Sequence, residues 1–336
     1  MEAGNYFDEA SHERTGANIL HLPRSVADSA KARGLEPEAL QRLMFEWRGK
    51  LFDRRGGRVR PLLDDKVLAD WNGLMIGALA RAGAVLHEPR YLQAAREAAE
   101  FVLTKMTQDG RLLHRYRKAT AGIPAFAEDY AFVANGLLQL YQADFNPRWL
   151  AEADRLAAEL LRLFQRDNGL LYTQASDDPD AMIAPNTNLF DGAIPSANSA
   201  GAYALARLGA LLQKQAYTDA AAKILKALGT RLTEMAVAHN YALLALEWLV
   251  LPVREVVVAG TREQAAHMLE LLHGRFQPRT VIVLHEPGEA GEPIRKLVPF
   301  LTGQGPVEGK ATAYVCENYT CQAPLTDLEK LKTSLG

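Results

Sequence analysis

The amino-acid sequence predicts a mainly helical protein, an α/α toroid followed by a small α/β tail. Three observations lead to this fold class. Apolar residues recur at helical spacing from about residue 40 to residue 251, helices that are apolar nearly all round alternate with amphipathic ones, and one loop pattern returns three times. We expect residues 1–252 to form the toroid and residues 253–336 to form the tail.

The helices follow from apolar side chains spaced three and four residues apart, which line one face of a helix. Residues 1–35 lack this periodicity and are expected to be irregular. Glycine, proline and aspartate punctuate the connections between helices. The expected helices are eight in number and cover residues 40–51, 67–86, 91–106, 130–141, 149–164, 200–212, 217–232 and 239–250.

These helices differ in how they distribute their polar residues. Residues 74–83, 133–138 and 200–209 are apolar nearly all round and rich in small side chains, as helices surrounded by other helices are. Residues 91–106 and 149–164, which follow the first two of them, carry charges on one face. An inner helix followed by an outer helix is the arrangement of an α/α toroid.

An internal repeat supports the toroid. Residues 55–73, 109–131 and 168–199 share one order: a turn, a short strand-like stretch, a polar loop and the start of an inner helix. The loops meet their inner helices about 60 to 65 residues apart, roughly one helical hairpin with its connection. Tetratricopeptide arrays repeat at about 34 residues with short turns, so that architecture fits poorly.

The tail has a different pattern. Residues 255–260 and 280–284 are apolar, β-branched runs typical of buried strands, and residues 263–272 between them have helical spacing. This is a βαβ unit with a parallel pair of strands, and residues 311–316 are expected to add a third strand. The glycine that ends the first strand is not followed by the further glycines of a dinucleotide-binding loop, so no nucleotide site is expected.

Composition excludes several classes of protein. The chain has 336 residues, of which 48% are hydrophobic and 23% charged, and its formal net charge is -2. This even balance gives no reason to expect nucleic acid or an anionic membrane as a partner. No apolar run reaches the roughly 20 residues of a membrane span, and the first 25 residues lack the apolar block of a signal peptide. With only two cysteines, a reducing, cytoplasmic location is expected.

The three repeated loops place acids and amides where the inner helices begin, and aromatic residues lie among them. Carboxylates beside aromatic rings suit a sugar, because acids transfer protons or bind hydroxyl groups and rings stack on C–H faces. We therefore expect a small-molecule sugar as partner, and no metal or cofactor. The candidate catalytic residues are Glu128, Asp129, Asp70, Asp191 and, as a base other than a carboxylate, His239. The candidate substrate-binding residues are Trp71, Asn72, Tyr130, Arg60, Arg115, Ser196 and Asn198.

A structural interpretation stands beside each candidate. Asp, Asn and Ser at helix starts are ordinary N-caps, which bond the free N–H groups of the first turn. Two adjacent acids, Glu128 and Asp129, exceed what one cap needs. His239 is more typical of a core histidine, and His114, beside Arg115 and Arg117, of a surface residue. The two cysteines, Cys316 and Cys321, are expected to be structural or incidental thiols, because no second pair completes a zinc site.

The stretch Asp-Asp-Lys-Val-Leu-Ala-Asp-Trp-Asn-Gly at residues 64–73 is distinctive. Together with residues 4–20, 191–199 and 313–327, it resembles the spermatogenesis-associated, thioredoxin-domain-containing proteins (the YyaL-like group). The resemblance implies a toroid of the six-hairpin glycosidase type, similar to glycosidases and N-acylglucosamine 2-epimerases. Family members also carry an N-terminal thioredoxin-like domain, for which this chain shows neither a C-x-x-C motif nor an early βαβ unit.

We therefore expect a carbohydrate-active protein, a glycoside hydrolase or a sugar 2-epimerase-like enzyme, with its sugar in the funnel of the toroid. The alternative is a non-catalytic binding or scaffold region of a thioredoxin-domain-containing protein. A funnel open to the acids and Trp71 favours the enzyme, and a funnel plugged by apolar side chains favours the scaffold. A closed six-hairpin toroid needs twelve helices and eight are expected here, so we expect self-association, or a separate chain that supplies the missing hairpins.

Overall fold

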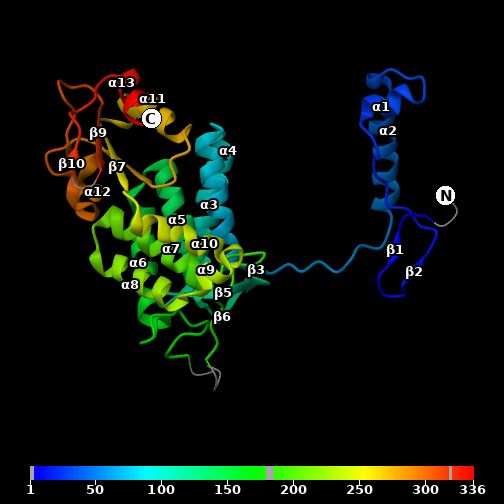
Figure 1. Ribbon diagram of the computed structural model, residues 1–336, viewed down its shortest axis with the longest axis horizontal. Helices are drawn as coiled ribbons and strands as arrows, with labels where there is room; N and C mark the ends of the chain where they lie inside the picture. The colour runs from blue at the N-terminus through cyan, green and yellow to red at the C-terminus, as the bar shows by residue number, and fades with distance from the viewer. Residues whose placement is uncertain (1–3, 179–184, 318–319) are drawn as a thin grey trace. The chain divides into compact units, whose positions relative to one another are not determined.

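The computed structural model describes residues 4–178, 185–317 and 320–336, and it is mainly helical, which confirms the predicted fold class. Contacts divide the chain into two compact units, residues 1–64 and residues 65–336 (Figure 1). This division was not foreseen. The expected boundary near residue 252 stays a prediction.

The smaller unit contains a short hairpin and two helices. The strands are β1 (Phe7–Asp8) and β2 (Glu13–Arg14), and the helices are α1 (Val26–Lys31) and α2 (Pro37–Gly56). The side chain of Ser25 accepts a hydrogen bond from the Asp28 backbone N–H and so caps α1. The first 35 residues are therefore less irregular than expected. The first helix predicted from periodicity is α2, so it lies outside the unit that holds the other seven.

The larger unit is built from helical hairpins with an inner and an outer layer. Inner helices α3, α5, α7 and α10 pack side by side in that order, and outer helices α4, α6 and α8 each pack on the inner helix before them. The inner helices are α3 (Ala69–Val85), α5 (Ala127–Asp144), α7 (Ala197–Leu212) and α10 (Asn240–Val250). The outer helices are α4 (Pro89–Lys105), α6 (Pro147–Phe164) and α8 (Gln215–Leu228). This confirms the alternation of inner and outer helices.

Glycines allow the closest contact between two inner helices. A Cβ atom on Gly73 of α3 would lie 2.5 Å from the Val133 backbone nitrogen, and one on Gly136 of α5 would lie 2.3 Å from the Gly73 carbonyl oxygen. Any larger residue at either position would force α3 and α5 apart. Between α8 and α10 the chain is less regular than predicted, because α9 (Arg231–Glu234) and a 3₁₀ turn at Ala236–His239 follow the left-handed Gly229.

A small antiparallel sheet lies at the N-terminal ends of α3 and α5 (Figure 1). Its strands are β3 (Val67–Leu68), β4 (Thr107–Gln108), β5 (Arg111–Arg117) and β6 (Thr120–Pro124), with Val67 opposite Tyr116. The strand-like stretch of the second repeat is therefore a true strand. In the third repeat it is a single bridge between Gln165 and Leu171.

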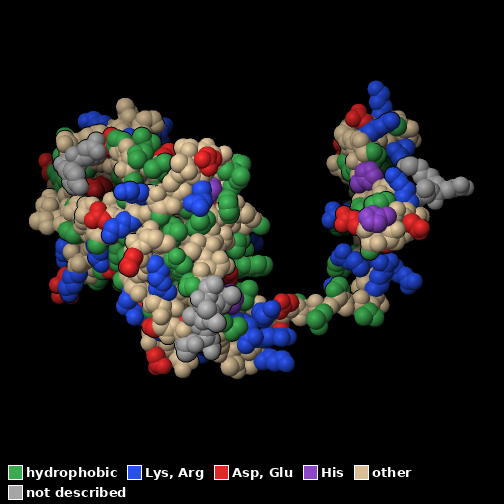
Figure 2. Space-filling model, turned by 60° about the horizontal axis from the view of Figure 1, so that its bottom comes forward, with side chains coloured by type: hydrophobic (Ala, Val, Ile, Leu, Met, Phe, Trp, Pro, Cys, Tyr) green, Lys and Arg blue, Asp and Glu red, His purple; other side chains and the backbone are tan. Residues whose placement is uncertain are grey.

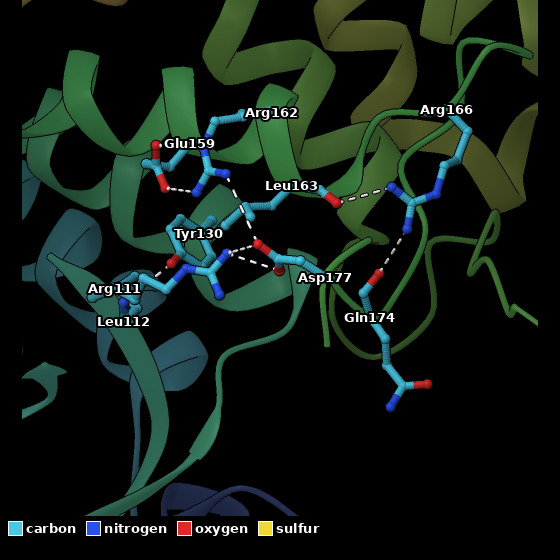
Figure 3. Close-up of polar contacts among 9 residues, drawn as sticks. All are labelled: Arg111, Leu112, Tyr130, Glu159, Arg162, Leu163, Arg166, Gln174 and Asp177. Atoms are coloured by element: carbon cyan, nitrogen blue, oxygen red, sulfur yellow. Dashed lines mark hydrogen bonds and ion pairs between the residues drawn. The ribbon is translucent and has the colours of Figure 1, made fainter. Parts of the chain in front are cut away.

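Ion pairs anchor the loop that follows this bridge (Figure 3). The guanidinium of Arg111 on β5 donates to both oxygens of Asp177, at 2.8 and 2.6 Å. Arg166 donates to the carbonyl oxygens of Leu163 and Gln174, at 3.0 and 3.4 Å. The loop is thereby tied to the sheet and to the end of α6.

The tail is a mixed four-stranded sheet in the order β10-β9-β7-β8, with β7 parallel to β8 and antiparallel to β9. The predicted βαβ unit and third strand are confirmed. The elements are β7 (Arg254–Ala259), α11 (Arg262–His273), β8 (Thr280–His285), α12 (Glu292–Leu297), β9 (Thr312–Glu317), β10 (Thr320–Cys321) and α13 (Leu328–Ser334). Two 3₁₀ turns, Gly288–Gly291 and Pro299–Leu301, flank α12.

The tail meets the C-terminal ends of the inner helices, opposite β5 and β6 (Figure 1). The buried Gln142 amide of α5 pairs with the backbone of Ile282 on β8: its Nε2 donates to the carbonyl oxygen at 2.7 Å and its Oε1 accepts from the N–H at 3.0 Å. In β9 and β10, Cys316 and Cys321 are opposite each other and form a disulfide, with Cα atoms 3.9 Å apart. The expectation of free thiols is therefore wrong.

Among the described residues, none of the helices is long and apolar enough to cross a membrane. Some hydrophobic side chains are solvent-exposed on the surface of the larger unit (Figure 2). Those on the flank of α3 include Trp71, Met75 and Leu86, and those on α10 include Leu244 and Val250.

Candidate functional site

Asp129, in the first turn of α5, is the centre of a cluster of titratable side chains. It is fully buried. Its Oδ1 accepts the backbone N–H of Asp70 at 2.9 Å, and its Oδ2 accepts the backbone N–H of Phe126 at 2.7 Å. The Nδ1 atom of His114 lies 3.0 Å from both oxygens. One carboxylate therefore joins the start of α3, the start of α5 and strand β5.

His114 lies on β5 and faces the helix starts, whereas the sequence suggested a surface residue. Successive side chains of a strand point to opposite faces, so one face of β5 carries Leu112, His114 and Tyr116. The core contacts of Leu112 and Tyr116 show that this face is the inner one. The hydrogen bond to Asp129 raises the pKa of His114 against the opposing effect of burial. With Nδ1–H directed at Asp129, Nε2 is the ring nitrogen left for other chemistry. The two-residue alternation of β5 was the sequence signal that could have identified this histidine.

Two further acids adjoin this pair. Burial, followed by the negative charge of Asp129, raises the pKa of Asp70, whose Oδ1 accepts the Trp71 backbone N–H at 2.7 Å. Burial also raises the pKa of Glu128, and the charges of Asp129 and Asp70 add to this effect. Carboxyl groups that retain a proton more readily than usual are suited to act as general acids. Unlike Asp129, Glu128 makes no side-chain hydrogen bond to another residue of the described chain, and its carboxylate accepts only its own backbone N–H group.

The same cluster has the composition of a cation site. One ligand atom each from Asp70, His114 and Asp129 can be chosen so that all lie within 4.8 Å of one another. A cation bound by Nδ1 of His114 would displace the proton that this atom donates to Asp129, whereas a cation bound by Nε2 would leave that proton in place. Each Asp129 oxygen already accepts a backbone N–H group, and the proton on His114 Nδ1 is shared with the same carboxylate. These hydrogen bonds account for the arrangement of the cluster without a metal.

The acid of the third repeat holds another helix. Asp191 Oδ1 accepts the Ser196 backbone N–H at 2.9 Å, and its Oδ2 accepts the Tyr241 backbone N–H at 2.8 Å in the first turn of α10. Ser196 caps α7 through Ser199, at 3.1 Å. These three contacts are those of helix caps. Asp191 thus does for α10 what Asp129 does for α3.

Two other candidates are also engaged in the fold. The Asn198 side chain bonds both the N–H and the carbonyl oxygen of Leu171, at 2.8 and 2.9 Å. His239 is buried beside Phe190, with ring centroids 5.3 Å apart, and its Nδ1 lies 3.0 Å from the Met235 carbonyl oxygen. Its Nε2 has no partner within the described residues. His239 therefore fits the core interpretation, with one ring nitrogen satisfied.

The remaining binding candidates divide into accessible and enclosed residues. Trp71 is 61% exposed at the start of α3 and offers an open ring. Tyr130 is only 1% exposed and its hydroxyl accepts the Leu112 backbone N–H at 3.1 Å (Figure 3), so it belongs to the core and not to a platform. Asn72 donates to the Leu68 carbonyl oxygen at 2.7 Å. Arg115 lies on β5 with a buried Nε that has no described partner, and Arg60 lies in the smaller unit.

Comparison with known proteins identifies relatives over nearly the whole chain. Spermatogenesis-associated protein 20 from Homo sapiens is 33% identical over 349 residues, and the protein of the same name from Rattus norvegicus is 32% identical over 350. The chain is a homologue of spermatogenesis-associated protein 20. The alignments cover 99% of this chain but 44% of each relative, so the chain spans less than half of their length. No protein-family model matches the chain.

Several solved structures resemble parts of the chain at low sequence identity. The GH76 α-mannanase BT2949 of Bacteroides thetaiotaomicron has a TM-score of 0.44 and 14% identity, covering 64% of this chain and 59% of that one. Cellobiose 2-epimerase from Bacillus thermoamylovorans B4167 has a TM-score of 0.41 and 14% identity, covering 76% and 66%. At these values the site has to be interpreted from its own side chains.

Proposed function

We propose that the N-terminal ends of α3 and α5 bind a sugar and transform it by acid–base catalysis, as a glycoside hydrolase or a sugar 2-epimerase-like enzyme does. One observation carries the proposal: Asp70 and Glu128, two acids with raised pKa, lie around the hydrogen-bonded pair of His114 and Asp129. Groups whose pKa values are perturbed by burial and by a specific charged neighbour are typical of catalytic sites.

Each residue has a role that its surroundings suggest. Glu128 is the proton donor, because burial favours its protonated form and its side chain is hydrogen-bonded to no other described residue. His114 Nε2 is the base, and Asp129 is the positioning residue that orients its ring. Asp70 is the second acid, and the exposed Trp71 ring is the stacking platform.

The two reaction types make different demands on this site. Hydrolysis uses two carboxyl groups, about 5–5.5 Å apart for retention of configuration or about 6.5–9.5 Å apart for inversion. Epimerisation needs a base beside the carbon atom that loses its proton, for which His114 is better placed by chemistry than a carboxylate. A product analysis that separates hydrolysed from epimerised sugar would decide between them.

A panel of monosaccharides and glycans, assayed by thermal shift, tests the proposal. We expect at least one sugar to raise the melting temperature of the wild type and of a control variant, Glu97→Gln, whose exposed side chain bonds only Gln93 in the described chain. Glu128→Gln should still bind that sugar and lose its turnover, because the amide cannot donate a proton as an acid. If no sugar raises the melting temperature of the wild type, the proposal of a sugar-transforming enzyme is wrong.

A second function is favoured by a specific observation. Both oxygens of Asp129 and both oxygens of Asp191 accept backbone N–H groups, so two of the five predicted catalytic residues hold the fold. This is what a non-catalytic binding or scaffold region of a thioredoxin-domain-containing protein requires. Under this alternative, Glu128→Gln would behave like Glu97→Gln with every sugar.

Association is part of the proposal, because α3 and α10, the first and last helices of the inner layer, expose apolar side chains. Met75 and Leu86 flank α3, and Leu244 and Val250 flank α10. Large exposed apolar patches are uncommon on soluble monomers. We expect self-association, or the binding of a separate chain, to cover these flanks, and cytoplasmic localisation. A stable monomer in light scattering that binds no hydrophobic dye would contradict the association.

A further inference from the structure

A cavity lies at the other end of the inner helices, next to the tail. It has a volume of about 230 Å³. The C-terminal halves of α3, α5, α7 and α10 line it, together with the segment between α11 and β8. The inner helices contribute large polar side chains to the lining: Arg81 from α3, Gln139 and Gln142 from α5, Arg207 from α7 and Glu247 from α10.

Arg207 is the unusual member of this set, because its charge is buried without a carboxylate. The residue is 8% exposed. Its guanidinium carbon lies 5.1 Å from the centre of the Tyr203 ring and 6.0 Å from that of Trp248. Its one hydrogen bond, from Nη2 to Gln139 Oε1, is 3.4 Å long, beyond the usual range for N–H···O. No carboxylate of a described residue lies within 4.0 Å of it, since none of the ion pairs includes Arg207.

The rest of the lining adds positive charge. Arg81 and Arg275 are further cations, and burial lowers the pKa of His273, which keeps that ring neutral at pH 7. Glu247, the one acid in the lining, faces Arg279 at 3.9 Å. The cavity thus has more cationic than anionic groups.

We infer that this cavity binds a small molecule that carries a carboxylate or phosphate group. A guanidinium presents paired N–H groups to two oxygens of such a group, and this charge-assisted contact is among the strongest hydrogen bonds in proteins. The rings of Tyr203 and Trp248 keep Arg207 in place and provide a wall for the less polar part of the ligand. The volume is below that of sites for drug-sized molecules, so the ligand is small, such as a single sugar ring with its acid group.

The competing explanation is that Arg207 is only a packing residue held by its two rings. The two explanations differ in what happens when the charge is removed. In an anion site, the buried cation destabilises the ligand-free protein because it lacks a counter-ion. Arg207→Met should therefore not lower the melting temperature of the ligand-free protein. A packing role predicts a lower melting temperature for Arg207→Met and no response of the wild type to anions.

The test measures thermal shift and calorimetric binding of the full chain at constant ionic strength. The probes are inorganic phosphate, glucose 6-phosphate and glucuronate, with glucose as the neutral control. We expect an acidic probe to bind the wild type and an Arg90→Gln control, whose exposed side chain pairs with Glu88 outside the cavity. Arg207→Met should weaken that binding by about 10-fold or more. Phosphate probes and glucuronate distinguish the two kinds of acid group.

A second variant guards against a folding failure. Arg81→Gln changes an exposed side chain at the rim of the cavity and should weaken binding less than Arg207→Met does. The ranking of the probes by affinity should stay the same. The inference is overturned if no acidic probe binds the wild type, if glucose binds as well as glucuronate, or if Arg207→Met and Arg81→Gln both bind like the wild type. Because these readouts measure binding at the tail end, they are independent of turnover at Glu128.

Discussion

The two ends of the same inner helices carry opposite charge and treat it differently. At the N-terminal ends, Asp129 is buried and Asp191 is half-buried, and backbone N–H groups at the starts of the helices satisfy the oxygens of both. At the tail end, Arg207 is buried against two rings and one distant amide. The helix dipole favours acids at the first end and cations at the second. Within the described chain, however, only the acids have a hydrogen-bond donor for each oxygen. The N-terminal ends therefore use their charges mainly to hold the fold, and the tail end leaves its charge for a ligand.

The largest effect should come from removing the buried acid. Asp129→Ala leaves two backbone N–H groups and the His114 ring without their acceptor, and each unsatisfied buried donor costs about 1–3 kcal/mol. We expect the free energy of unfolding to fall by about 3–5 kcal/mol, as measured by urea denaturation.

The matched control is Asp219→Ala on α8, an exposed acid whose one hydrogen bond in the described chain joins it to Gln215. Its effect should stay within about 0.5 kcal/mol. A similar loss in both variants would mean that Asp129 is not the clasp between α3, α5 and β5.

A smaller effect is expected where the tail is attached to the helices. Gln142→Leu keeps the approximate size of the side chain and removes both hydrogen bonds to Ile282. The backbone N–H and carbonyl groups of Ile282, on the edge strand β8, would then lack these partners. We expect a loss of about 2 kcal/mol in the free energy of unfolding. An unchanged unfolding curve would show that apolar packing alone holds the tail in place.

Arg207→Met should have the smallest effect on stability of these three, with the free energy of unfolding unchanged or raised by about 1 kcal/mol. Replacing a buried, poorly paired charge by an apolar side chain of similar length is often neutral or stabilising. Urea denaturation in an anion-poor buffer measures it. A loss as large as that of Asp129→Ala would mean that both ends are equally satisfied, and the contrast between them would disappear.

The arrangement of the helices was predictable because burial leaves a period in the sequence. Small, apolar runs such as residues 74–83 and 200–209 became inner helices, and the β-branched runs around residues 255–260 became the tail sheet. The division after residue 64 was not predictable, because α2 has the same helical spacing as the helices that follow it.

The site was harder to predict than the fold, because its members are joined by contacts that spacing does not show. His114 was predicted to be a surface residue because Arg115 and Arg117 follow it. Its role depends on strand β5, which places it beside Asp129, fifteen positions further along the chain. Arg207 is hidden in an apolar run, and only the packing of α5, α7 and α10 shows that it has no acid beside it. Tyr130 failed as a binding candidate because its hydroxyl bonds Leu112 in the core.

The subtlest test of the acid end uses pH. The pKa of His114 in the folded protein is raised above its ordinary value of 6.5, chiefly by the hydrogen bond to Asp129, and the charges of Asp70 and Glu128 act in the same direction. A raised pKa means that the folded state binds the proton more tightly than the unfolded state. The resulting stabilisation is complete below about pH 6.5 and is lost as the pH rises through the folded-state pKa.

His114→Phe removes this titration and keeps the ring that packs on Phe126, whose centroid lies 5.0 Å from that of His114. Urea denaturation of both proteins from pH 5.5 to 8.5 should show the wild type losing more stability than the variant as the pH rises. The pKa values of Asp70 and Glu128 are also raised, and the charge of His114 acts against that rise, so the variant removes this coupling together with the titration of His114 itself. Parallel curves above pH 6.5 would mean that His114 gains no proton affinity from Asp129, which would remove the base from the proposed site.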